Sequence, residues 1–275
     1  MMTPGNPPTA TLPHGRLPLW GLIVLGLIAG SLSGLFGVGG GIIVVPALVL
    51  LGMDQSRAAG SSVAAILPTA VVGAISYGVA GHVDWIAGAI LAAGIIIGAQ
   101  FGSYLLSRLP RSVLFWIFIV FMAGVIVSLW VIIPERGDTI SIDWRAIFGL
   151  VLLGIVTGVL SGILGVGGGI IVVPALMLMF GAGDLIAKGT SLLMMIPGSL
   201  SGTIGNARRK NFDLRVAAAV GTAACVASPL GLLTATAISP LASNIAFSVL
   251  MVAVATQMVL RHFRTQRAAR DASAA

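Results

Sequence analysis

The sequence GVGGGIIVVPAL occurs twice in this chain, at residues 37–48 and 165–176. Each copy begins with four glycines in five positions, and an apolar run follows. Because each Gly costs ~1 kcal/mol relative to Ala in a helix, each cluster predicts a break before a short apolar helix. The free N–H groups at the start of that helix, with the positive end of its dipole behind them, favour an anion. The candidate anion-binding backbone is that of Gly39, Gly40, Gly41, Gly167, Gly168 and Gly169.

Close helix packing is the alternative explanation for the glycines. Gly30 and Gly34 have the small-xxx-small spacing that lets two helices touch, and so do Gly94, Gly98 and Gly102. Packing is the favoured interpretation for these five. Three consecutive glycines exceed what packing needs, so a bend that faces a substrate is favoured for the two clusters.

A pair of hydroxyl side chains follows each glycine cluster. Ser61 and Ser62 belong to the sequence GSS, and Thr190 and Ser191 belong to the matching sequence GTS. Such hydroxyls can cap a helix start, bond back to helix carbonyls, or donate to a bound oxyanion. All three interpretations stay open, and the four residues are candidates for substrate binding.

The two copies belong to a duplication that covers roughly residues 18–133 and 146–260. The motif HVDW falls on NFDL, so an aspartate recurs at the same place in each repeat. Elsewhere the copies diverge: Tyr77 matches Asn206, and His82 matches Asn211. Tyr77 and Asn206 are therefore further candidate substrate-binding residues, in two half-sites that are not chemically equal.

The composition excludes a water-soluble protein. Of the residues, 57% are hydrophobic and 8% are charged, against ~25% charged in soluble domains. The charges lie in narrow bands, and the gaps between them are long enough for spans of ~20 residues. Since lipid cannot satisfy an open backbone, we expect an all-α polytopic membrane protein with the lipid bilayer as a partner. The net charge of +7 is assigned to topology and lipid headgroups, and not to nucleic acid.

The charge-free stretch from residue 17 to residue 53 is too long for one crossing, and the glycine cluster interrupts it. It predicts a Gly-broken helical hairpin, followed by three transmembrane helices in each repeat. Each repeat then crosses the membrane an odd number of times, which predicts two inverted repeats. We expect both termini in the cytoplasm; the Lys and Arg distribution barely separates this arrangement from repeats inserted the same way up.

The expected organisation has five parts. They are a disordered tail at 1–17, a first repeat at 18–133, a loop at 134–145, a second repeat at 146–260 and a basic tail at 261–275. The small-residue face described above and the apolar last span allow a homodimer, but they can equally pack inside one protomer.

Taken together, these motifs resemble the TauE/SafE family of sulfite exporters over about residues 18–260. The resemblance is carried by the doubled SGxxGVGGGIIVVPAL, by GSS and GTS, and by the aspartates of HVDW and NFDL. It implies a bacterial cytoplasmic-membrane transporter that moves sulfur oxyanions, sulfite or an organosulfonate such as sulfoacetate, generally outward. An anion channel and a proton-coupled carrier for another small organic anion remain the alternatives.

Neither an enzyme nor a cofactor or metal site is expected. The three histidines lie far apart and Cys225 is the single cysteine, so no metal site or nucleophile dyad can be assembled. Every charge falls at a predicted membrane edge, and Asp84, Asp184 and Asp213 are expected as solvated loop charges. Transport is therefore expected without an obligatory proton, driven by the substrate gradient and by ~2.3 kcal/mol per charge per 100 mV of membrane potential.

Overall fold

In the computed structural model the described residues are 18–53, 55–106, 140–164, 167–208 and 212–274, with single positions between 116 and 130. The described residues form helices and no strands, which confirms the predicted all-α class. The predicted N-terminal tail, Asp54, Asn211 and most of the predicted span at 113–133 lie outside the described residues. The helices are α1 (Leu19–Phe36), α2 (Gly41–Leu50), α3 (Gln55–Val79), α4 (Trp85–Leu106), α6 (Trp144–Leu164), α7 (Gly169–Phe180), α8 (Asp184–Arg208), α9 (Leu214–Ala237) and α10 (Pro240–Ala274).

Within the described residues, five helices are long and apolar enough to cross a membrane: α1, α3, α6, α9 and α10. Shorter apolar helices lie at Gly41–Leu50, Trp85–Ala99 and Gly169–Phe180. Large apolar side chains such as Trp20, Val79 and Trp144 are exposed on the outer surface of the bundle, where lipid is their natural solvent. The chain is a multi-pass membrane protein.

Glycines break each hairpin as the sequence predicts. α1 ends at Phe36, and Gly37 follows with a φ of 69° and donates its N–H to the Ser33 carbonyl at 2.8 Å. Gly39 and Gly40 also have positive φ, and α2 begins at the next residue. In the second repeat, positive φ at 167 and 168 precedes the start of α7. Only glycine adopts such a run of left-handed backbone at low cost, which is why each break falls on these residues.

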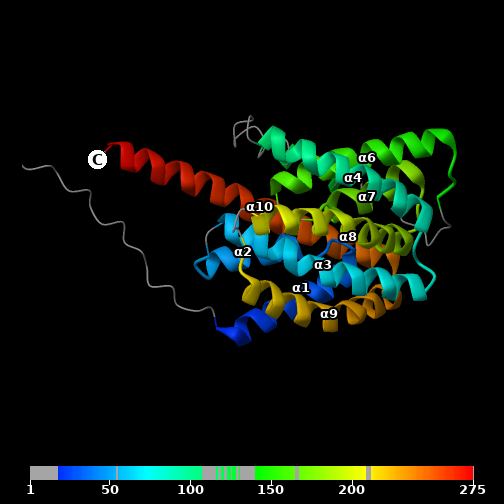
Figure 1. The fold of residues 1–275 in the computed structure, drawn as a ribbon, viewed down its shortest axis with the longest axis horizontal. Coiled ribbons are helices and arrows are strands. Elements are labelled where there is room, and N and C mark those ends of the chain that lie inside the picture. Colours follow the sequence, from blue (N-terminus) through cyan, green and yellow to red (C-terminus); the bar gives the residue numbers. More distant parts are fainter. Residues whose placement is uncertain are drawn as a thin grey trace, which may run out of the picture.

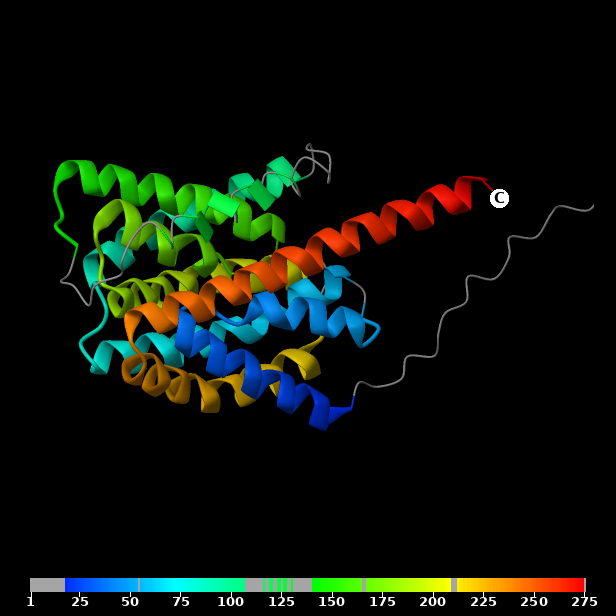
Figure 2. The same ribbon diagram turned by 180° about the vertical axis from the view of Figure 1, so that it is seen from behind.

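Equivalent helices of the two repeats have equivalent partners. α1 packs along α9, and α6, its counterpart in the second repeat, packs along α4; α3 and α8 meet in the centre. α1 and α6 run in opposite directions along the bundle, as do α3 and α8 (Figures 1 and 2). Inverted insertion of the repeats into a bilayer remains a prediction that this arrangement supports.

The isolated glycines pack helices together. A methyl group on Gly30 would meet the backbone of Ala224 in α9, and one on Gly98 would meet the carbonyl of Ile155 in α6. Gly34 and Gly94 lie equally close to the same two helices. The packing interpretation is confirmed for these four. The surroundings of Gly102 are not described, so its role stays a prediction. A homodimer stays a prediction, and it would have to use other faces, such as the exposed apolar side of α10.

The last helix is longer than the predicted last span. α10 has 35 residues, or roughly 52 Å at 1.5 Å per residue, which exceeds the ~30 Å hydrocarbon core of a bilayer. The basic residues assigned to a tail at 261–275 continue this helix up to Ala274. Its C-terminal part projects away from the bundle (Figure 2).

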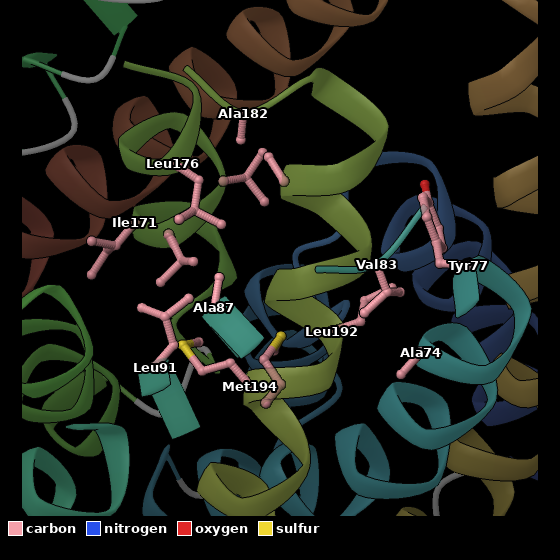
Figure 3. Packing of buried hydrophobic residues seen from close by; sticks show 14 of the residues in the cluster. Ala74, Tyr77, Val83, Ala87, Leu91, Ile171, Leu176, Ala182, Leu192 and Met194 are labelled. Carbon is pink, nitrogen blue, oxygen red and sulfur yellow. The ribbon is translucent and has the colours of Figure 1, made fainter. Parts of the chain in front are cut away.

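The main hydrophobic core surrounds α8. Figure 3 shows Met194 of α8 beside Leu91 of α4, while Tyr77 and Ala74 of α3 lie on the other side of α8. The two repeats therefore share one core, and the glycine breaks lie against it.

Candidate functional site

The two glycine bends meet in the interior. A methyl group on Gly169 would lie 2.5 Å from the carbonyl oxygen of Gly37 and 2.8 Å from the Cα atom of Val38. Ser191 of α8 donates its hydroxyl to the same Gly37 carbonyl at 3.0 Å. The second repeat therefore holds the bend of the first, at a contact between segments far apart in the sequence.

The hydroxyl pairs lie inside helices, which corrects the interpretation that they cap helix starts. α3 begins six residues before Ser61, α8 begins six residues before Thr190, and all four hydroxyl residues are buried. Ser61 accepts from the backbone N–H of Asp213 at 2.9 Å, and Thr190 accepts from that of Asp84 at 3.0 Å. These reciprocal bonds tie each repeat to the aspartate loop of the other, so Ser61 and Thr190 have a structural role here.

The second residue of each pair behaves differently in the two repeats. Ser191 is bonded to the first bend, whereas the Ser62 hydroxyl is fully buried and has no hydrogen-bond partner in the structure described. Ser62 lines a cavity of about 10 Å³, together with Gly39 of the bend and Thr69 one to two turns along α3. A cavity of this size holds about one water molecule.

Small side chains line this cavity beside the first bend. Ala65, Val220 and Ala224 line the cavity between α1, α3 and α9. Their counterparts in the other repeat are larger and fully buried: Met194, Leu91 and Ile95. At the second bend, larger side chains stand at the positions that small ones occupy around the first bend. The two halves are therefore sterically unequal.

Two further side chains close the space between the bends. Ile66 and Met195 occupy matching positions of the repeats. The Cε methyl of Met195 is the nearest atom to a methyl placed on either Gly39 or Gly167, and Ile66 atoms lie 3.3 Å from both positions. Both are buried. We call this pair the plug, because it fills the space between the Gly39 and Gly167 positions.

Comparison with known proteins places this arrangement in a family. The family model described as sulfite exporter TauE/SafE matches residues 2–131 and 150–275. The chain belongs to this family. It is similar to the probable membrane transporter protein YunE of Bacillus subtilis, with 30% identity over 211 residues that cover 67% of this chain and 77% of the relative. A probable membrane transporter protein of Xylella fastidiosa is 28% identical over 242 residues, which cover 86% of this chain and 93% of that relative. No solved structure matches the chain.

Two candidate residues of this TauE/SafE protein do not line the cavity. Tyr77 is fully buried and donates its hydroxyl to the carbonyl of Gly34 in α1 at 2.6 Å. Asn206 is half-buried and donates its amide to the Gly202 carbonyl of its own helix at 2.9 Å. The two residues differ between the repeats in their role as well as in their type. Tyr77 joins two helices, whereas Asn206 bonds within its own helix.

The expectation of solvated loop charges is wrong for Asp84 and Asp184, which are 6% and 1% exposed. The Asp84 carboxylate accepts from the N–H of Ala87 at 2.9 Å and of Ile140 at 3.2 Å, so the loop between the repeats covers it. Asp184 pairs with Lys188, which is 4% exposed, inside the first turns of α8. Asp213 is half-buried, and its carboxylate caps α9.

Sequence reasoning missed these burials because charge position along the chain shows where an apolar run ends, and not what covers that end. The signal available was spacing: Asp184 and Lys188 stand four residues apart, which places them on one face of a helix. Transport without an obligatory proton was predicted because every charge was expected at a membrane edge. The burial of Asp84, Asp184 and Lys188 removes that reason.

Proposed function

We propose that this TauE/SafE protein exports a small sulfur oxyanion, sulfite or an organosulfonate such as sulfoacetate, across the cytoplasmic membrane. The observation that carries the proposal is the unpaired, buried hydroxyl of Ser62 beside Gly39 in a cavity between the helices. A buried hydroxyl without a partner is costly, and an oxyanion would supply the missing acceptor. The free N–H groups at the start of α2 add donors and the positive end of a helix dipole.

The first bend is the proposed half-site for the anion, and the second bend supports it. Gly39 lines the cavity and Gly40 and Gly41 follow it directly in the chain, whereas Gly169 and Ser191 hold the Gly37 segment in place. Neutral donors hold an oxyanion weakly, which suits release on the far side better than a buried guanidinium would.

Binding requires the plug to withdraw. The cavity of about 10 Å³ has room for about one water molecule, so a sulfur oxyanion needs more space than this structure offers. Met195 is long and unbranched, and its methyl can leave the junction by rotation about its side-chain bonds. In an inverted pair of repeats with both termini in the cytoplasm, rocking of one repeat against the other would open this junction to each side in turn.

Efflux from liposomes tests the proposed function. The purified protein is reconstituted, the vesicles are loaded with sulfite, sulfoacetate, sulfate or taurine, and efflux is measured over a range of internal concentrations. We expect saturable efflux of sulfite or sulfoacetate. Rates that rise linearly with concentration, or single-channel currents, would support the channel alternative, and no efflux of any sulfur oxyanion would contradict the proposal.

Replacing Ser62 with Ala should weaken anion binding without harming the fold. A hydrogen bond to a charged group contributes ~1.5–3 kcal/mol, so we expect the KM for the transported oxyanion to rise about tenfold or more. Ser76→Ala in the same helix is the matched control, because the Ser76 hydroxyl bonds to the Val72 carbonyl of its own helix at 2.8 Å. Equal KM values for the two variants would remove Ser62 from the site.

A further inference from the structure

A buried ion pair lies against Gly37 of the first glycine bend, and neither of its residues lines the cavity of the proposed anion site. We propose that Asp184 and Lys188 form a proton-binding site that links proton uptake to anion binding. This inference rests on the proposed function, since it assigns a second ligand, the proton, to the same transport cycle.

The pair lies on α8 and contacts α10 in the interior. The Lys188 ammonium lies 3.2 Å from Oδ2 of Asp184 and donates to the hydroxyl of Ser243 in α10 at 2.7 Å. Both charged side chains are 5% exposed or less. The other carboxylate oxygen, Oδ1 of Asp184, is buried and has no hydrogen-bond partner in the structure described. This oxygen therefore has lone pairs that no neighbouring donor uses, and a proton can bind there.

The pair is mechanically connected to the bend. A methyl group on Gly37 would lie 2.6 Å from Cα and 2.9 Å from Cβ of Lys188, so α8 and the bend touch at this residue. Less than one turn further along α8, Ser191 holds the Gly37 carbonyl. A movement of the bend that admits an anion at Gly39 therefore also moves the backbone that carries Lys188.

Charge balance gives the direction of the linkage. The Asp184–Lys188 pair is neutral as a unit, so an anion that enters nearby meets no net positive charge. When a proton from water binds to Oδ1 of Asp184, the carboxylate becomes neutral and the pair gains one positive charge. The site is then cationic, which favours the anion, and by reciprocity the anion favours the proton. Only an O–H bond forms, and it breaks when proton and anion leave together.

Three other titratable groups lie near this end of α8. Tyr77 of α3 interacts with the Asp184 charge, and its hydroxyl is already donated to Gly34. The backbone carbonyl of His82 contacts the position of Gly189, one residue beyond Lys188. Each oxygen of the Asp84 carboxylate already accepts a backbone N–H group. Asp184 is the acid here with an oxygen left to protonate.

Calorimetry counts the protons directly. Sulfoacetate is titrated into the purified protein between pH 6 and pH 8 in buffers of different ionisation enthalpy, because its sulfonate stays ionised throughout. We expect up to one proton taken up per anion bound, and a Kd that weakens by up to about tenfold per pH unit as the pH rises. Asp184→Asn should bind with no proton uptake and with a Kd that does not change with pH. Asp213→Asn makes the same change at an acid that caps α9, and it should keep the wild-type proton uptake.

A second variant covers the case in which Asp184→Asn fails to fold, because that change removes the carboxylate that pairs with a buried lysine. In the double variant Asp184→Leu, Lys188→Met both charges are removed, which proteins tolerate better than the loss of one partner. It should bind sulfoacetate with a pH-independent Kd. If the wild-type protein binds sulfoacetate without proton uptake, or if the double variant keeps a pH-dependent Kd, the proton site is wrong and the proposed function stands. If the wild-type protein binds neither sulfoacetate nor sulfite, both proposals fail.

Discussion

Replacing Gly39 with Ala should abolish oxyanion transport while the protein still folds. The added methyl would point into the junction, where it meets Cε of Met195 and lies 3.3 Å from Ile66. It would occupy the space in which the plug must move and the anion must bind. The backbone at Gly39 has a φ of 77°, which costs a non-glycine residue roughly 1–2 kcal/mol. This cost is small compared with the loss of the site, so we expect efflux at background level from a protein of nearly normal yield.

Gly81→Ala separates backbone strain from crowding. Gly81 has a φ of 76°, almost the same as Gly39, and no atom lies within 4 Å of the position of its missing methyl. This variant should carry the same strain and transport normally. The double variant Gly39→Ala, Met195→Ala removes the nearest clashing atom and should recover part of the lost efflux. Normal transport by Gly39→Ala alone would show that the first bend is not on the substrate path.

The sequence was sufficient to predict the breaks and the helices around them. The left-handed conformations that glycine allows and its low helix propensity are both local properties. The glycine clusters alone therefore predict where α1 ends and where α7 begins, and the structure confirms both positions. The prolines show the limit of local reasoning. Pro46 is the sixth residue of α2, beyond the first turn that local rules favour for proline, and it leaves the carbonyl of Ile42 without its helical donor.

Burial of polar groups could not be predicted from the sequence, because it depends on segments far away in the chain. Asp84 is covered by residue 140, and Lys188 is covered by Ser243 of α10. Similarly, Ser62 and Ser191 occupy matching positions of GSS and GTS. Only the packing shows that the Ser191 hydroxyl is bonded and the Ser62 hydroxyl is not.

One difference between the half-sites was present in the sequence alignment of the repeats. Ala65 and Ala224 match Met194 and Ile95, which exchanges small for large side chains around equivalent bends. Their common role as cavity walls appears only in the structure, because the two residues come from different helices. Duplication thus supplied a symmetric scaffold, and substitution at a few wall positions left room in one half.

The wall of that cavity depends on how closely α1 and α9 approach, which leads to the largest expected effect on stability. Replacing Gly30 with Ala would place a methyl against the backbone of Ala224, 2.5 Å from its Cα atom and 2.7 Å from its carbonyl carbon. A backbone cannot rotate away as a side chain can, so α1 and α9 would have to separate. Overpacking of this kind costs ~1–3 kcal/mol, and we expect a lower thermal midpoint in detergent and less monodisperse protein.

Gly205→Ala in α8 is the matched control for Gly30→Ala. No atom lies within 4 Å of the position of its methyl, so the change should stabilise the helix by ~0.5–1 kcal/mol. Ala29, Val220 and Ala224 line the cavity on both sides of the α1–α9 contact. Separation of these helices should therefore also weaken oxyanion binding by the folded fraction of the Gly30→Ala variant. Equal thermal midpoints for the two variants would mean that α1 and α9 approach less closely than the backbone contact at Gly30 requires. The cavity would then owe its size to the small side chains of α3 alone.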